Sequence, residues 1–225
     1  MFSDIFYKIW DAGLIQLGVW ETIYLTLIPT VIAYLLGLPL GVLLCVTDKE
    51  GLHPLPVLNK ILSVFVNIFR SIPFIILMVA MLPVAKFLVG TSLGNKAMIV
   101  TLVIAAAPFV ARLVESSLLE VDGGVIEAAQ SMGASTMQII MKVLLPEALP
   151  SLINGSAIAA TTILGYSAMS GAVGGGGLGK LAIMYGYNRY QTDIMFITVV
   201  LLIVIVQVFQ SFGNWATKRS DRRIS

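Results

Sequence analysis

The chain has 225 residues, of which 58% are hydrophobic and only 12% are charged. A typical soluble domain carries roughly 45–50% apolar and about 25% charged residues, so this chain cannot cover a water-facing surface with charge. A net charge of +2 excludes the basic footprint of a nucleic-acid-binding protein, and one cysteine and one histidine exclude an internal disulfide and a zinc site. The composition and a mean hydropathy of +0.94 predict an all-α membrane protein surrounded by lipid.

The N-terminal segment, residues 1–18, mixes charged and apolar residues and lacks the order of a cleaved signal peptide. Its amphipathic pattern, with Trp10 inside it and Trp20 just beyond it, predicts a segment that lies along the outer membrane interface.

Five stretches after this segment are long and apolar enough to cross the membrane, which takes about 20 residues for roughly 30 Å of hydrocarbon. We expect the prolines inside them to be tolerated, as they are in many membrane helices. The predicted spans cover residues of about 22–46, 61–82, 97–118, 149–172 and 194–212.

Five crossings place the two ends of the chain on opposite sides, and the distribution of Lys and Arg selects the orientation. With the C-terminus in the cytoplasm, eight of the 14 cationic residues lie inside, five lie outside, and Arg70 is unassigned. The run TKRSDRR belongs to a basic cytoplasmic tail, residues 213–225, directly after the last span. The sequence therefore predicts an outer N-terminus and a cytoplasmic C-terminus.

Residues 120–148 form the longest polar stretch between two spans, on the cytoplasmic side of this topology. A first short helix is predicted over residues 125–132 and ends at Gly133, which suits a left-handed stop. A second begins at Ser135, with Gln138 at the spacing of a capping box, and ends before Pro146. From the pattern alone, the segment could also be a re-entrant hairpin packed on the chain's own spans. One face of the first helix is apolar, through Val125, Ile126, Ala129 and Met132.

The same loop resembles the EAA signature of ABC importer permeases. Glu127, Ala128 and Ala129 are followed by Gly133 and, after nine intervening residues, by VLLP with Val143 in place of the usual isoleucine. In that family the loop forms a coupling helix that docks into a groove of a cytoplasmic ATPase subunit. The resemblance implies an ATPase-coupling role for Glu127, Ala128, Ala129, Gly133, Leu145 and Pro146.

Four further segments resemble the permeases of methionine importers: residues 18–27, 67–75, 142–150 and 165–179. The resemblance implies a type I importer fold over residues 19–212, in a bacterial inner membrane. It also implies a homodimer with two ATPase chains and a periplasmic or lipid-anchored methionine-binding protein. ATP and Mg²⁺ would bind to the ATPase, so this chain would hold no cofactor and no enzymatic activity. L-methionine and D-methionine are both candidate substrates.

The glycine-rich segment before Leu181 does not constitute a nucleotide site. Gly174, Gly179 and Lys180 nearly spell a P-loop, but Leu181 stands where a hydroxyl must bind Mg²⁺. We expect these glycines to end the fourth span and to permit close backbone packing.

The fourth span is rich in small residues and hydroxyls, which suits either close packing or a lining of the transport path. The predicted path and gate residues are Tyr166, Ser167, Met169 and Ser170. The long thioether of Met169 could plug a narrow passage, although filling a packing gap is the commoner use of methionine.

Three ionisable residues lie in or near the spans, where such groups are rare. Arg112 and Glu115 are three residues apart near the cytoplasmic end of the span, so we expect them to pair on one helix face or to extend to the interface. Arg70 could either begin the second span or lie inside it.

Two alternatives stay open: a permease for another amino acid, and an ion-coupled secondary transporter. Secondary transporters commonly show inverted repeats and buried ion-binding carboxylates. We find no repeat and no acidic residue near the middle of a span.

Overall fold

A computed structural model describes residues 4–220, and every regular element within them is a helix. Five helices are long: α2 (Leu14–Thr47), α3 (Pro56–Ser71), α6 (Asn95–Leu119), α10 (Leu149–Ser170) and α12 (Thr192–Ser220). The shorter helices are α1 (Asp4–Asp11), α4 (Phe74–Ala80), α5 (Leu82–Val89), α7 (Gly123–Ser131), α8 (Thr136–Ile139), α9 (Leu145–Glu147) and α11 (Gly177–Leu181). Two π-helical segments, Ile140–Leu144 and Ala182–Tyr187, and a 3₁₀ turn, Gly171–Val173, complete them.

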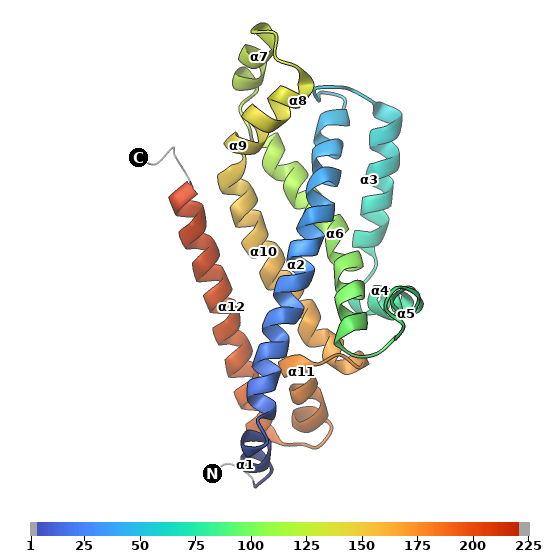
Figure 1. The fold of residues 1–225 in the computed structure, drawn as a ribbon, viewed down its shortest axis with the longest axis vertical. Helices are drawn as coiled ribbons and strands as arrows, with labels where there is room; N and C mark the ends of the chain where they lie inside the picture. Colours follow the sequence, from blue (N-terminus) through green and yellow to red (C-terminus); the bar gives the residue numbers. More distant parts are fainter. Residues whose placement is uncertain (1–3, 221–225) are drawn as a thin grey trace.

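Four of the predicted spans are single helices that lie side by side (Figure 1). Each of α2, α6, α12 and the continuous segment Leu149–Val173 is long and apolar enough to cross a membrane. They contain the predicted spans 22–46, 97–118, 194–212 and 149–172. The hydrophobic runs therefore identified these helices correctly, and the helices extend beyond them.

The predicted second span, 61–82, is not one helix. It is broken between α3 and α4, which are bent by 103°. Ile72 has extended backbone angles (φ −81°, ψ 128°), as a residue before proline prefers, and Pro73 is extended too. Pro73 therefore ends the helix that we expected to tolerate it, and α4 and α5 lie across the bundle before α6 returns (Figure 1).

Both terminal boundaries differ from the predicted ones. The helix α2 begins at Leu14, so residues 14–18 of the predicted N-terminal segment are part of the first long helix. The helix α12 continues to Ser220, so residues 213–220 of the predicted tail are helical. Residues 1–3 and 221–225, which include Arg222 and Arg223, lie outside the described part of the chain.

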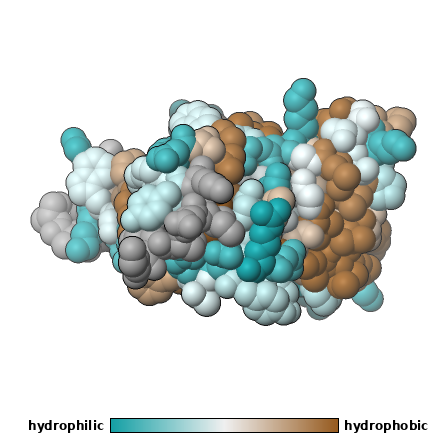
Figure 2. All heavy atoms as spheres, turned by 90° about the horizontal axis from the view of Figure 1, so that it is seen from below, coloured by the Kyte–Doolittle hydropathy of each residue, from teal (hydrophilic) through white to brown (hydrophobic). Residues whose placement is uncertain are grey.

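The two ends of the bundle carry different elements. The helices α1 and α11 lie at one end, and α7, α8 and the last turn of α12 lie at the other (Figure 1). Figure 2 looks onto the α1 end, where hydrophilic side chains gather, with a broad apolar surface on the side of α3–α5. Below, the end with α7 and α8 is called the hairpin end and the other the α1 end.

Two glycines one turn apart bring α2 against α6. A Cβ atom on Gly41 would lie 2.5 Å from the carbonyl oxygen of Ala111, and one on Gly37 would lie 2.7 Å from Val110 Cγ1. Small residues at this spacing allow close approach of membrane helices. The contact fixes α6, which carries Arg112 and Glu115.

Candidate functional site

The polar loop forms a hairpin of two short helical segments, as predicted. The Asp122 carboxylate caps α7 by accepting a hydrogen bond from the Gly124 N–H at 2.7 Å. Gly133 then turns the chain with a φ of +79°. The predicted capping box is confirmed: the Ser135 hydroxyl accepts from the Gln138 N–H at 3.4 Å, and Gln138 Oε1 accepts from the Ser135 N–H at 2.8 Å.

The predicted end of the second segment before Pro146 is wrong. From α8 the chain continues through the π-helical residues Ile140–Leu144 into α9, which contains Pro146. Pro146 stands in the first turn of α9, where a missing N–H is easily accommodated. The segment from Thr136 to Glu147 is therefore continuously helical, and it leads through Ala148 into α10.

The predicted apolar face of α7 divides into a buried and an exposed part. Ala129 is buried, and Ile126 packs beside it on the core that includes Ile139. Val125 and Met132 point away from this core, and Met132 is 82% exposed. The hairpin lies beyond the ends of α2 and α6 (Figure 1), so this surface is not placed to meet hydrocarbon. Such a surface outside the membrane is typical of a site for another protein.

The six predicted coupling residues occupy different positions on the hairpin. Glu127, Ala128, Gly133 and Pro146 are exposed, Leu145 is half-buried and Ala129 is buried. Glu127 also lines a cleft of about 400 Å³ between α7 and the loop after α2, together with Asp48 and Glu50. These carboxylates give the exposed hairpin an acidic border.

The four predicted path residues do not share one face of α10. Met169 is 51% exposed, on the same side as Ile158 and Gly165. Ser167 and Ser170 are buried, and their hydroxyls donate to the carbonyls of Leu164 (2.8 Å) and Ser167 (2.6 Å).

Tyr166 lies in a third environment. Its ring stacks on Phe74 of α4, with centroids 4.0 Å apart and planes 3° apart. A role of the four residues in transport stays a prediction, and the geometry favours Met169 and Tyr166 over the two serines.

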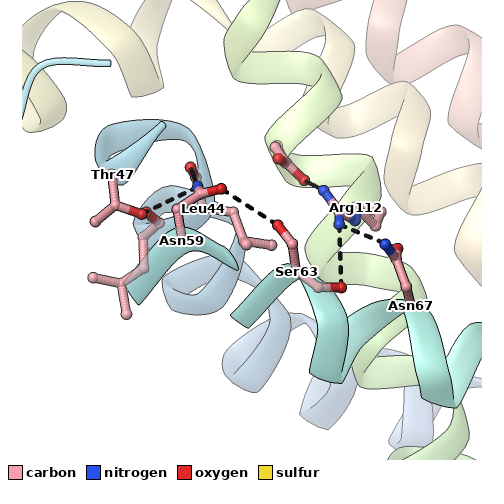
Figure 3. A network of polar contacts seen from close by, with 8 residues as sticks. Leu44, Thr47, Asn59, Ser63, Asn67 and Arg112 are labelled. Atoms are coloured by element: carbon pink, nitrogen blue, oxygen red, sulfur yellow. Dashed lines mark hydrogen bonds and ion pairs between the residues drawn. The ribbon is translucent and has the colours of Figure 1, made fainter. Parts of the chain in front are cut away.

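A row of polar side chains fastens α3 to α2 (Figure 3). The Asn59 amide donates to the Leu44 carbonyl at 2.7 Å and to Thr47 Oγ1 at 3.2 Å. One turn further, Ser63 Oγ donates to Asn59 Oδ1 at 3.5 Å. Sequence analysis missed this row, although its spacing of four residues was a detectable signal.

The predicted pair of Arg112 and Glu115 is confirmed and forms the other end of this network (Figure 3). The guanidinium and the carboxylate are 2.6 Å apart, and their side chains are only 22% and 11% exposed. Arg112 also donates to Asn67 Oδ1 at 3.1 Å and to the Ser63 carbonyl at 3.5 Å, which ties α3 to α6. The ion pair therefore helps to hold α3 against α6, and it keeps the Arg112 guanidinium beside α3.

A second network, at the α1 end, was not predicted. Glu21 of α2 accepts from the Asn95 amide at 2.7 Å and from the Gly177 N–H at 2.6 Å. The neighbouring Thr22 hydroxyl accepts from the Leu178 N–H at 2.9 Å. The three helices α2, α6 and α11 are therefore joined at the α1 end, close to the end of α10.

The glycine-rich segment takes part in this junction by allowing close contact. A Cβ atom on Gly179 would collide with the Ala168 backbone, and one on Gly171 with the Lys180 backbone. Gly177 has a φ of +81°, which side chains rarely adopt. Close backbone packing, as expected from the sequence, is confirmed here.

Comparison with known proteins gives consistent matches over most of the chain. The family model described as "Binding-protein-dependent transport system inner membrane component" matches residues 34–225. A "Probable D-methionine transport system permease protein MetI" from Vibrio cholerae is 54% identical over 213 residues, which is 95% of either chain. The "Methionine import system permease protein MetP" of Bacillus subtilis is 49% identical over 181 residues, 80% of this chain and 82% of that one.

Solved structures agree with the sequence matches. A chain of the MetNI methionine ABC transporter, in an inward-facing conformation, has 48% identity and a TM-score of 0.92, over 93% of this chain and 97% of that one. An amino acid ABC transporter chain with 19% identity and a TM-score of 0.78 has the same fold. The all-α bundle is the type I importer fold, and this chain belongs to the family of binding-protein-dependent transport system inner membrane components.

Proposed function

We propose that this chain is the membrane-spanning permease of an ABC importer for methionine. The observation that carries the proposal is the likeness to the MetNI permease chain, which extends over nearly the whole of both chains at high identity. The named relatives, a probable D-methionine permease from Vibrio cholerae and a methionine import permease from Bacillus subtilis, support the same substrate. L- and D-methionine are both candidates, and a permease for another amino acid is the alternative.

The hairpin is proposed to bind a separate ATPase chain and to transmit its conformational change on ATP hydrolysis to the spans. Its exposed apolar side chains, such as Met132, and the acidic border around Glu127 suit a partner groove with an apolar floor and basic rims. ATP and Mg²⁺ would bind to that partner, and this chain would act as a transport subunit without enzymatic activity. Two ATPase chains and a periplasmic or lipid-anchored binding protein complete the proposed importer.

A second copy of the chain is proposed to face the exposed side of α10. This side carries Ile158, Gly165 and Met169, and a path between two copies needs a face of this kind. In a two-fold dimer the same residue from each chain can meet at the axis. Two Met169 thioethers meeting there could close the path and part again without breaking hydrogen bonds.

The orientation is proposed from the charge distribution. The hairpin end carries the basic end of α12 and would face the cytoplasm of a bacterial inner membrane. The α1 end, with Glu21 and the glycine-rich segment, would face outwards. A reporter fused behind the chain should be active in the cytoplasm, and one inserted near Gly90 should be active outside; the reverse pattern would contradict the proposal.

An ion-coupled secondary transporter is less consistent with the geometry. Among the side chains described, Glu115 is the acidic residue buried within a span, and Arg112 already neutralises it. A coupling-ion site would need an available buried carboxylate.

The experiment that tests the proposal is uptake of labelled methionine into vesicles that contain the permease, its ATPase and its binding protein. We expect uptake that requires ATP, and none driven by an ion gradient alone. Glu127→Lys should abolish uptake while the protein still inserts into the membrane. Lys86→Glu reverses one exposed charge on α5, outside the hairpin, and should leave uptake unchanged. Normal uptake by Glu127→Lys would contradict the coupling role.

A further inference from the structure

Arg70 continues the polar row of α3 beyond the part that is already bonded. Asn59, Ser63 and Asn67 recur every four residues and bond to α2 and α6 (Figure 3). Arg70 follows three residues later, on the same side of the helix. Its side chain is exposed, and it forms no hydrogen bond or ion pair with any residue from 4 to 220. The row therefore ends in a free positive charge.

This charge lies far along α3 from the hairpin end. The helix α3 has 16 residues and begins at Pro56, at the hairpin end. At 1.5 Å per residue, Arg70 is about 21 Å along the helix, well into a hydrocarbon layer of roughly 30 Å. A guanidinium at such depth faces a bundle interior or a water-filled cavity, because exposure to lipid is costly.

Two cavities meet at Arg70. The first, of about 220 Å³, is walled mainly by the aromatic rings of Phe69, Phe74, Phe109 and Tyr166. The second, of about 430 Å³, is shared between Arg70, Phe109 and the Arg112–Glu115 pair, and reaches Leu119 at the end of α6. Arg70 and Phe109 line both cavities, so the two cavities adjoin at these side chains, and the second extends along α6 from Phe109 to Leu119.

We propose that Arg70 and the aromatic cavity bind the transported amino acid inside the membrane. The guanidinium holds the α-carboxylate through paired N–H donors, and the rings surround an apolar thioether side chain, which packs well against aromatic edges. The volume of the first cavity, about 220 Å³, lies below the roughly 300–1,000 Å³ of sites for drug-sized ligands, so it suits a small solute. The assignment of methionine to this site rests on the proposed function.

Arg112 lines the second cavity and provides the next cationic position along α6. Its charge is already balanced by Glu115, so it attracts a carboxylate less strongly than Arg70 does. Its Nε–H is buried and has no hydrogen-bond partner among the described residues, which leaves one donor available. A substrate released from Arg70 thus passes a weaker site before it leaves at the hairpin end.

The test uses the assembled importer, two permease copies with their ATPase, in vesicles. The complex is irradiated with a diazirine analogue of methionine, and the labelled peptides are identified by mass spectrometry. We expect labels on the segments that contain Phe74, Phe109 or Tyr166. Methionine should compete with labelling, and methioninol, which has an alcohol in place of the carboxylate, should compete roughly 10- to 100-fold less well. Equal competition by the two, or labels only elsewhere, would overturn the proposal without any variant.

Variants of Arg70 give a second, independent arm. Arg70→Gln should reduce labelling and methionine uptake at least tenfold while the ATPase still co-purifies, and Arg70→Lys should restore part of both. Lys86→Gln removes an exposed cation of α5 outside both cavities and should change neither. Normal labelling of Arg70→Gln would overturn the site. Should Arg70→Gln fail to assemble, the analogue competition still decides.

Uptake and labelling together distinguish a wrong binding site from a wrong proposed function. If the unaltered importer takes up no labelled methionine, the proposed substrate is wrong. If it takes up methionine but labels map away from Arg70, only the binding site is wrong.

Discussion

Replacing Glu21 with Gln should destabilise the α1 end of the bundle. The carboxylate holds Asn95 at 2.7 Å and the Gly177 N–H at 2.6 Å, so it joins three helices. Glutamine keeps one oxygen and turns an amide N–H₂ towards the second donor. One of the two charge-assisted hydrogen bonds is therefore lost.

The size of the effect follows from that single bond. A hydrogen bond to a charged group contributes about 1.5–3 kcal/mol to the free energy of unfolding, and the partial exposure of Glu21 favours the lower figure, about 1.5 kcal/mol. For a chain of this size, 1 kcal/mol corresponds to roughly 2–4 °C in melting temperature. We therefore expect Glu21→Gln to melt about 3–6 °C below the unaltered protein in detergent, followed by tryptophan fluorescence.

The control is the same chemical change at an exposed site. Glu50→Gln, in the loop after α2, should melt within about 1 °C of the unaltered protein, because surface substitutions of this kind have small effects. A double-mutant cycle of Glu21→Gln with Asn95→Ala should reveal coupling between the two side chains. Equal melting temperatures for Glu21→Gln and Glu50→Gln would refute the idea that this network holds the end together.

Three further predictions concern packing, coupling and the gate. Gly41→Val places a branched side chain against the Ala111 carbonyl and should lower the free energy of unfolding by about 1–3 kcal/mol, measured as a lower melting temperature. Gly123→Ala is the control, because no atom lies within 4 Å of the added Cβ, and it should have almost no effect. Met132→Glu should weaken co-purification of the ATPase severalfold without lowering the melting temperature, because the side chain is 82% exposed. Met169→Ala should raise passive leakage of small solutes from vesicles or uncouple ATP consumption from uptake. Tight vesicles with unchanged transport per ATP would exclude the gate and leave Met169 a packing residue.

The spans could be predicted from hydrophobic runs, but the effect of each proline could not. Pro29 and Pro108 stay inside helices and are buried against neighbours, whereas Pro39 stays inside α2 although it is exposed. Pro73 is exposed and ends α3. Neighbours can hold a proline inside a membrane helix, as they do at Pro29 and Pro108, and a single sequence does not say which neighbours a segment will have.

In the candidate sites, contacts between residues close in sequence could be predicted, and contacts between distant residues could not. The capping box at Ser135 and the pair of Arg112 and Glu115 involve residues three apart, and local spacing predicted both. The bond between Glu21 and Gly177 joins residues 156 positions apart, so no local pattern indicates it. The aromatic cavity at Arg70 likewise requires α3, α4, α6 and α10 together.

The helix α10 connects the two ends that the predictions address. Its first turn continues from the hairpin through α9, and its last turn carries Met169. Its 22 residues span about 33 Å at 1.5 Å per residue. A displacement of the hairpin should therefore move the Met169 end of this helix as well. The helix α11, which follows α10, is bonded to α2 through Glu21, so α10 can move relative to a fixed α11. The variants should accordingly separate: Met132→Glu weakens binding of the ATPase, Met169→Ala causes leakage or uncoupling, and Glu21→Gln lowers the melting temperature.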